Sequence, residues 1–98
     1  MEEEIILTER EKVFIRALRA VTDANPTGLS TFTLTASNKL ADTAKSFRDA
    51  ARGMERNSFN AEVFTRAASR NETGSELLWQ AYQEIRHLEA QDFATQAL

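Results

Sequence analysis

Basic side chains recur along the longest segment of the chain that lacks glycine and proline. Lys45, Arg48 and Arg52 follow one another at steps of three or four residues, the spacing of one face of an α-helix. The planar guanidinium of arginine forms paired hydrogen bonds with carboxylates and phosphates. We interpret this arginine stripe as a candidate contact for an acidic protein or a small phosphorylated ligand. With its extension along the following segment, the stripe comprises Lys45, Arg48, Arg52, Arg56, Arg66 and Arg70.

The arginine stripe has a second interpretation that involves no ligand. Asp49 and Glu55 lie within reach of Lys45 and Arg52 if the segment is helical, and such pairs partly neutralise the basic charge. The stripe would then be a solvated helix face held by ion pairs, each of which contributes little to stability. Both interpretations stay open at the level of sequence.

Four larger side chains are candidate anchors for a protein interface. Trp79 and Tyr82 lie three residues apart, and tryptophan and tyrosine dominate the energetics of many interfaces. Phe47 and Met54 lie on the apolar face of the segment that carries the arginine stripe, where a second copy of the chain would share them. The alternative for Trp79 is that it fills one end of the domain interior.

The sequence offers little for catalysis or metal binding. Cysteine is absent and His87 is the one histidine, so the chain has no cysteine nucleophile and no disulfide. Glu84 and His87 have the Glu-x-x-His spacing of di-iron bundles, but those sites need the motif on two helices together with further glutamates. We therefore expect a non-enzymatic protein without a metal or cofactor.

Composition predicts a single small domain that associates with itself. The chain has 98 residues, of which 42% are hydrophobic, and 15 of these hydrophobic residues are alanine. Alanine favours helix but buries little area, so the chain's own core should be thin. Small domains commonly compensate by burying more area against a copy or another protein. We expect one domain over residues 1–98 that forms a homo-oligomer.

The charge distribution narrows the partners and the location. A net charge of −3 disfavours nucleic acid as a partner, since phosphate attraction needs a cationic surface. No apolar run is long enough to cross a membrane, and we expect no membrane contact. The lead segment 1–7 is acidic where a secretory signal would be basic, so we expect a cytoplasmic protein.

The spacing of apolar residues predicts an all-α fold of about four helices, arranged as two helical hairpins with a long second helix. The predicted helices span about 9–24, 31–55, 60–71 and 75–95, and Thr8 with Glu11 has the spacing of a capping box. Turn signals at 25–28, 57–60 and 71–74 separate them. Residues 29–35 also alternate apolar and hydroxyl side chains as a strand does, but no partner strand exists.

Two predicted helices carry an apolar stripe that should face the interior. The stripe of the first helix comprises Val13, Ala17, Ala20, Val21 and Ala24, flanked by Phe14 and Leu18. The stripe of the second helix comprises Leu29, Phe32, Ala36, Leu40, Ala44, Phe47, Ala51 and Met54.

Three functions fit these features. We expect a protein-interaction module with the profile of a small inhibitor or adaptor of viral or bacterial origin. One alternative is an oligomeric binder of a phosphorylated or nucleotide ligand through the arginine stripe. The abundance of alanine, threonine and serine, with long helices and no cysteine, resembles the composition of secreted filament subunits such as flagellin and type III needle proteins. This resemblance implies a structural subunit of a helical assembly as the other alternative.

Overall fold

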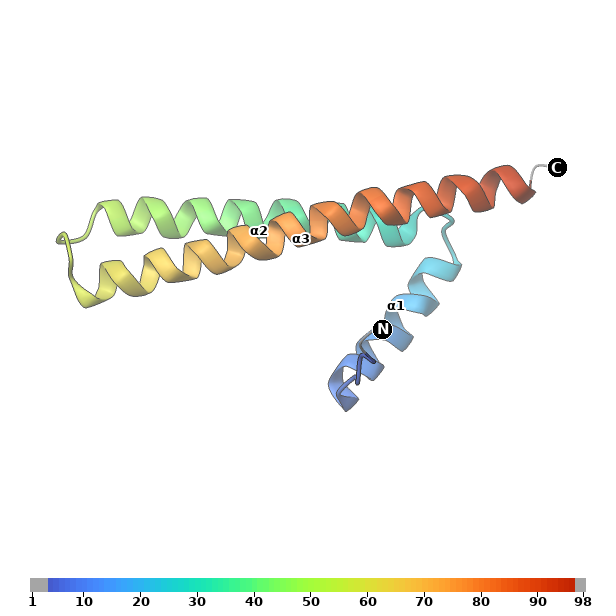
Figure 1. The fold of residues 1–98 in the computed structure, drawn as a ribbon, viewed down its shortest axis with the longest axis horizontal. Helices are drawn as coiled ribbons and strands as arrows, with labels where there is room; N and C mark the ends of the chain where they lie inside the picture. The colour runs from blue at the N-terminus through green and yellow to red at the C-terminus, as the bar shows by residue number, and fades with distance from the viewer. Residues whose placement is uncertain (1–3, 97–98) are drawn as a thin grey trace.

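The computed structural model describes residues 4–96 and contains three helices. They are α1 (Glu9–Asp23), α2 (Gly28–Arg52) and α3 (Phe59–Gln96). Helices α2 and α3 lie side by side as an antiparallel hairpin, and α1 diverges from the open end of this hairpin (Figure 1). The all-α prediction is confirmed, whereas the prediction of four helices is wrong because the last two form one continuous helix.

Helix α1 begins as its sequence predicts. The Thr8 hydroxyl accepts a hydrogen bond from the Glu11 amide at 3.2 Å, and the Glu11 carboxylate accepts one from the Thr8 amide at 3.0 Å. This reciprocal capping box satisfies two amides that would otherwise lack partners at the helix start.

Helix α1 packs only loosely on the rest of the chain. Its main aromatic contact joins Phe14 to Phe32 of α2, with ring centroids 6.0 Å apart. None of its residues is buried, and its half-buried side chains include Ile15 and Leu18. The predicted inner stripe is therefore wrong: Val13 and Val21 are exposed, because α1 meets α2 through the neighbouring face.

Residues 29–35 are helical, as the longer periodicity favoured. Hydroxyl groups here bond within the helix, and Thr33 Oγ1 donates to the Leu29 carbonyl at 2.7 Å. Thr27, the residue before α2, makes no side-chain capping bond. The cap instead comes from α3, where the Glu89 carboxylate accepts from the Ser30 amide at 3.2 Å and from the Ser30 hydroxyl at 2.6 Å.

The turn between α2 and α3 starts earlier than predicted. Helix α2 ends at Arg52 rather than near residue 55, and Gly53 is its C-cap. Asn57 adopts a φ of 64°, a left-handed conformation that asparagine tolerates better than most residues. The Ser58 hydroxyl then accepts a hydrogen bond from the Ala61 amide at 3.1 Å and so caps α3.

Helix α3 runs without interruption through the predicted break at 71–74. Polar side chains at this point bond back to the helix that contains them: the Asn71 amide donates to the Ala67 carbonyl at 2.7 Å, and Thr73 to the Ser69 carbonyl at 3.1 Å. Gly74 leaves room for Leu40 of α2, because a Cβ at this position would lie 3.0 Å from the Leu40 Cδ1 atom. Packing between the helices thus explains a glycine that the sequence alone suggests is a helix end.

Helices α2 and α3 face one another through rows of residues that alternate steps of three and four, the pattern of a coiled coil. We call these rows the inner seam. On α2 and the turn after it, the inner seam comprises Ser30, Thr33, Ser37, Leu40, Ala44, Phe47, Ala51 and Met54. On α3 it comprises Ala61, Phe64, Ala68, Asn71, Ser75, Leu78, Tyr82, Ile85 and Glu89.

The predicted stripe of α2 is right from Leu40 onward and wrong before it. The inner seam continues from Leu40 back to Ser37, Thr33 and Ser30, which are 3–5% exposed, whereas Phe32 is 47% exposed. The residues of the predicted stripe between 32 and 44 are spaced by four three times in succession, whereas a single row alternates spacings of three and four. The predicted stripe therefore crosses from one row of the helix to the neighbouring row. It favoured the larger apolar residues, while the structure places hydroxyl groups between the helices.

The inner seam buries little apolar surface. Among residues 4–96 the buried hydrophobic residues are Ala44 and Ala68, and no larger side chain is fully buried. The radius of gyration is 17.8 Å, compared with about 13 Å for a compact domain of this length. The monomer is therefore extended, and most of its large apolar side chains remain in contact with solvent.

Candidate functional site

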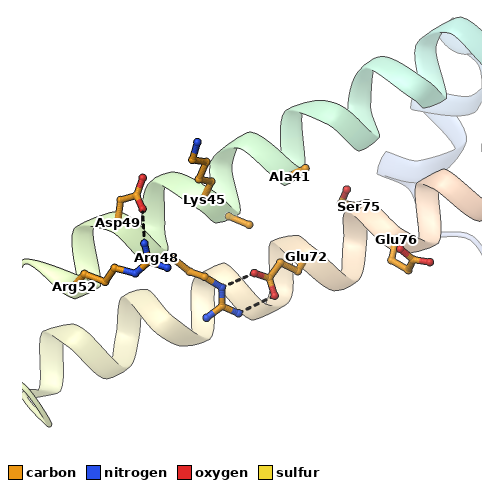
Figure 2. Close-up of a pocket in the computed structure, with 9 residues that line it drawn as sticks. Ala41, Lys45, Arg48, Asp49, Arg52, Glu72, Ser75 and Glu76 are labelled. Atoms are coloured by element: carbon orange, nitrogen blue, oxygen red, sulfur yellow. Dashed lines mark hydrogen bonds and ion pairs between the residues drawn. The ribbon is translucent and has the colours of Figure 1, made fainter.

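The basic residues of α2 border a shallow depression between the two helices of the hairpin. Its volume is about 470 Å³, and Figure 2 shows its lining in close-up. Arg48 reaches across from α2 and forms a paired ion contact with Glu72 of α3, with 2.7 Å between Nη2 and Oε2. The lining residues are Ala41, Ala44, Lys45, Arg48, Asp49, Arg52, Glu72, Ser75 and Glu76.

The contact between Arg48 and Glu72 stabilises the charged form of each group. Hydrogen bonds from Arg48 lower the pKa of the Glu72 carboxyl, and the same bonds raise the pKa of the Arg48 guanidinium. Arg48 Nη2 also lies 3.5 Å from the Ser69 hydroxyl. The central arginine of the stripe is thus engaged by the neighbouring helix of its own chain.

Acidic side chains alternate with basic ones around this depression. Arg52 lies 3.4 Å from the Asp49 carboxylate, and Glu76 completes a set of three acids that oppose the three bases of the lining. A surface of this kind has little net attraction for a phosphate, since the anion meets carboxylates as well as guanidiniums. It better matches a protein surface that also carries charges of both signs.

The structure brings together half of the predicted basic set. Lys45, Arg48 and Arg52 share the depression, whereas Arg56 lies in the turn beyond α2. Arg66 is paired with Glu62 on α3 and lines a separate hollow near Asn57. Arg70 lies on the opposite side of α3, because it comes two residues before Glu72, which pairs with Arg48.

Three of the predicted anchors are used within the chain. The ring of Phe47 lies 5.6 Å from that of Phe64 across the inner seam, and Met54 is half-buried beyond it. Tyr82 belongs to the inner seam and accepts a hydrogen bond from Arg86 at 2.7 Å. Trp79 packs against Tyr82 with 5.4 Å between ring centroids but is 41% exposed, so it remains the most accessible of the four.

A larger depression lies at the open end of the hairpin, between the start of α2 and the last third of α3. Its volume is about 610 Å³, and its walls include Leu34, Tyr82, Arg86 and Phe93. Glu89 also lines it, but this carboxylate is already engaged in capping Ser30. The hollow is mainly apolar, with one guanidinium at its rim.

A second row of residues, not predicted from the sequence, runs along each helix of the hairpin, and we call these rows the outer seam. It lies beside the inner seam and has the same alternation of three and four. On α2 the outer seam comprises Leu29, Phe32, Ala36, Lys39, Thr43, Ser46 and Ala50. On α3 it comprises Val63, Ala67, Arg70, Gly74, Leu77, Ala81, Glu84 and Leu88. The signal was present in the sequence, as Leu29, Phe32 and Ala36, but was assigned to the inner seam.

Residues 4–96 contain no cluster of three or more acidic or histidine side chains placed to hold a metal ion. Within the same range, no helix combines the length and the apolar character needed to cross a bilayer.

Comparison with known proteins adds no assignment. No protein-family model matches the chain, and neither a curated protein nor a solved structure gives a match.

Proposed function

We propose that this protein is a non-enzymatic interaction module that works as a homo-oligomer of helical hairpins. One observation carries the proposal: the monomer exposes 8335 Å², compared with about 5,600 Å² for a compact protein of the same mass. The excess of about 2,700 Å² exceeds the roughly 800 Å² that each partner buries in a standard interface. A chain with this much surface and so thin an interior gains most of its stability by burying area against a copy.

The charged depression around Arg48 is the second element of the proposal. It would remain on the outside of an assembly and would contact another protein whose surface also carries both charges. The profile of a small inhibitor or adaptor agrees with this arrangement, because such proteins act through surfaces and need no catalytic groups. Alternating charges of this kind contribute more to specificity and association rate than to affinity.

Sedimentation velocity at a series of concentrations tests the proposal. We expect a dimer or a larger closed oligomer at micromolar concentration, and a thermal midpoint that rises with protein concentration because association stabilises the folded state. A helical monomer with a concentration-independent midpoint would refute it. Growth without limit in light scattering would instead support the structural-subunit alternative.

A further inference from the structure

Nine of the fifteen outer-seam residues are exposed in the monomer, and the other six are half-buried. Leu77 and Leu88 of α3 are 60% and 57% exposed, and Phe14 of α1 contacts the outer-seam residue Phe32. Helix α1 then diverges from the open end of the hairpin (Figure 1). The ion pair between Arg48 and Glu72 and the charged depression lie on the opposite side of the hairpin. Interface centres are depleted of charge, and the outer seam carries charge only at Lys39, Arg70 and Glu84.

We propose that the outer seam is the contact with a second copy of this chain. The two copies are related by a two-fold axis that lies in the interface between the hairpins and runs at right angles to their helices. Under this symmetry α2 packs antiparallel on α2 of the copy, and α3 on α3 of the copy. The result is a four-helix bundle in which every neighbouring pair of helices is antiparallel. This inference rests on the proposed homo-oligomer and specifies its interface.

Side-chain size along the seam supports this symmetry. Leu29 and Leu88 lie at the open end of the hairpin, while Ala50 and Ala67 occupy the corresponding places near the turn. An antiparallel two-fold places the large pair of one copy on the small pair of the other, and the reverse contact follows from the symmetry. Between them lie further small residues, together with the larger Phe32 and Leu77; the small residues are Ala36, Thr43, Ser46, Gly74 and Ala81. Large side chains facing small ones allow close packing without voids.

Charge along α3 supports the same axis independently of size. Arg70 precedes Leu77 by seven residues and Glu84 follows it by seven, so an axis at Leu77 places Arg70 opposite Glu84 of the copy, twice per dimer. Neither side chain takes part in an ion pair with another residue among 4–96. The same axis brings the exposed Leu77 onto Leu77 of the copy.

The α2 row has its midpoint at nearly the same level of the hairpin. Size complementarity on α2 centres between Ala36 and Thr43, close to Leu40, and Leu40 contacts the position of Gly74 in α3. The two midpoints differ by about three residues, or roughly 4.5 Å along the helix, so one axis passes close to both rows. Lys39 meets its own copy at the rim, where its long side chain extends into solvent and keeps its charge hydrated.

The other face-to-face symmetry, an axis parallel to the helices, fits less well. It would stack the two open ends, so that Leu29 and Leu88 meet the same large pair of the copy and the small residues near the turn leave a gap. It would also place α3 on α2 of the copy, where Arg70 and Glu84 meet no opposite charge at their own levels. The antiparallel arrangement is preferred on both counts.

A charge-exchange experiment in solution tests the arrangement. Arg70→Glu places two acidic groups opposite each other in both symmetric contacts, and Glu84→Arg places two basic groups there. Each variant alone should raise the dissociation constant of the dimer roughly ten- to thirtyfold, because two attractive pairs become repulsive. An equimolar mixture of the two variants should return the dissociation constant to that of the parent, since the mixed dimer contains two opposite-charge pairs. Both residues are exposed, so folding of each variant is checked by circular dichroism.

Disulfide trapping gives a geometric test on the same protein. The chain contains no cysteine, so Leu77→Cys introduces a single thiol that should cross-link to its own copy rapidly under mild oxidation. Disulfides need Cα atoms about 4.4–6.8 Å apart, which a residue on the two-fold axis satisfies. Gln83→Cys, an exposed position six residues away on a different face of α3, is the matched control and should cross-link far more slowly.

The outcomes separate this inference from the proposed function. A parent protein that sediments as a dimer, with no recovery in the mixture and equal cross-linking at both positions, would overturn the outer-seam interface and leave the oligomer intact. A parent protein that stays monomeric would overturn the proposed function itself. Recovery in the mixture together with selective trapping at Leu77→Cys supports both.

Discussion

Replacement of Gly74 by alanine tests how closely the two hairpin helices approach. Alanine in the interior of α3 should stabilise that helix by about 1 kcal/mol relative to glycine. The new methyl group, however, would lie 3.0 Å from Leu40 Cδ1, closer than carbon atoms pack at their optimum of roughly 3.5–4.0 Å. Overpacking of this kind typically costs about 1–3 kcal/mol. We therefore expect Gly74→Ala to leave stability unchanged or to lower it by up to about 2 kcal/mol.

A double-mutant cycle isolates that contact from the effect on the helix. In a Leu40→Ala background the crowded methyl is gone, so Gly74→Ala should stabilise by the full helix contribution of about 1 kcal/mol. The difference between the two backgrounds, about 1–3 kcal/mol, measures the contact between α2 and α3. Urea unfolding followed by circular dichroism at one fixed protein concentration provides the values, since association would otherwise shift the midpoint.

Gly53 supplies the matched control for this cycle. A Cβ at Gly53 meets nothing closer than the Ala50 carbonyl at 3.6 Å, and its φ of −81° suits any residue. Gly53→Ala should therefore change stability equally with and without Leu40 in place. If Gly74→Ala stabilises by about 1 kcal/mol while Leu40 is present, then the two helices do not pack in this register and our account of the inner seam is wrong.

Two further perturbations test polar contacts between the helices. Glu89→Ala removes the carboxylate that accepts hydrogen bonds from the Ser30 amide and hydroxyl. It should lower the free energy of unfolding by about 0.5–2 kcal/mol, as loss of a helix cap does, whereas Glu76→Ala on the exposed face should be nearly neutral. Equal effects of the two variants would contradict capping across the hairpin. The pKa of Glu72 is lowered in the folded state, so its contribution to the free energy of unfolding is complete above its ordinary pKa of 4.5 and is lost as the pH falls below that value. When the parent and Glu72→Gln are titrated with acid, the variant should lose less stability than the parent. An equal loss of stability in both proteins would argue against the pair with Arg48.

Local signals in the sequence predicted the parts of the fold that local forces determine. The capping box at Thr8, the helical periodicity of α2 and the turn signal at 57–60 depend on neighbours within a few residues, and all three appear in the structure. Contacts between distant segments determine the parts of the fold that were not predicted. The break predicted at 71–74 is absent because the inner seam of α3 continues through it and Leu40 occupies the space beside Gly74.

Hydrophobicity alone could not decide which of the two adjacent rows of α2 faces α3. Leu29 and Phe32 are the larger apolar residues, yet Ser30 and Thr33 face α3 because their hydroxyl groups find acceptors there or in their own helix. The candidate site was also predicted only in part. Periodicity placed Lys45, Arg48 and Arg52 on one side of α2 correctly, but Glu72, the partner of Arg48, lies 24 residues further along the chain. Pairings at that separation require the register of the hairpin, which the sequence leaves open.

An inner seam rich in hydroxyl groups specifies register more than it supplies stability. Ser37 donates to the Ser75 carbonyl and Ser75 to the Ser37 carbonyl, each at 2.8 Å, and a slip along the seam would separate these partners. Each such bond contributes only about 0.5–1.5 kcal/mol in net terms, and little apolar area is buried beside them. The hairpin is thereby aligned by polar contacts, while Phe32, Leu77 and Leu88 of the outer seam stay exposed. In the dimer that we propose, the register of each hairpin is fixed before association, so a second copy would meet a preformed row of Leu29, Leu77 and Leu88, and burial of that row would add stability to a hairpin with a thin interior.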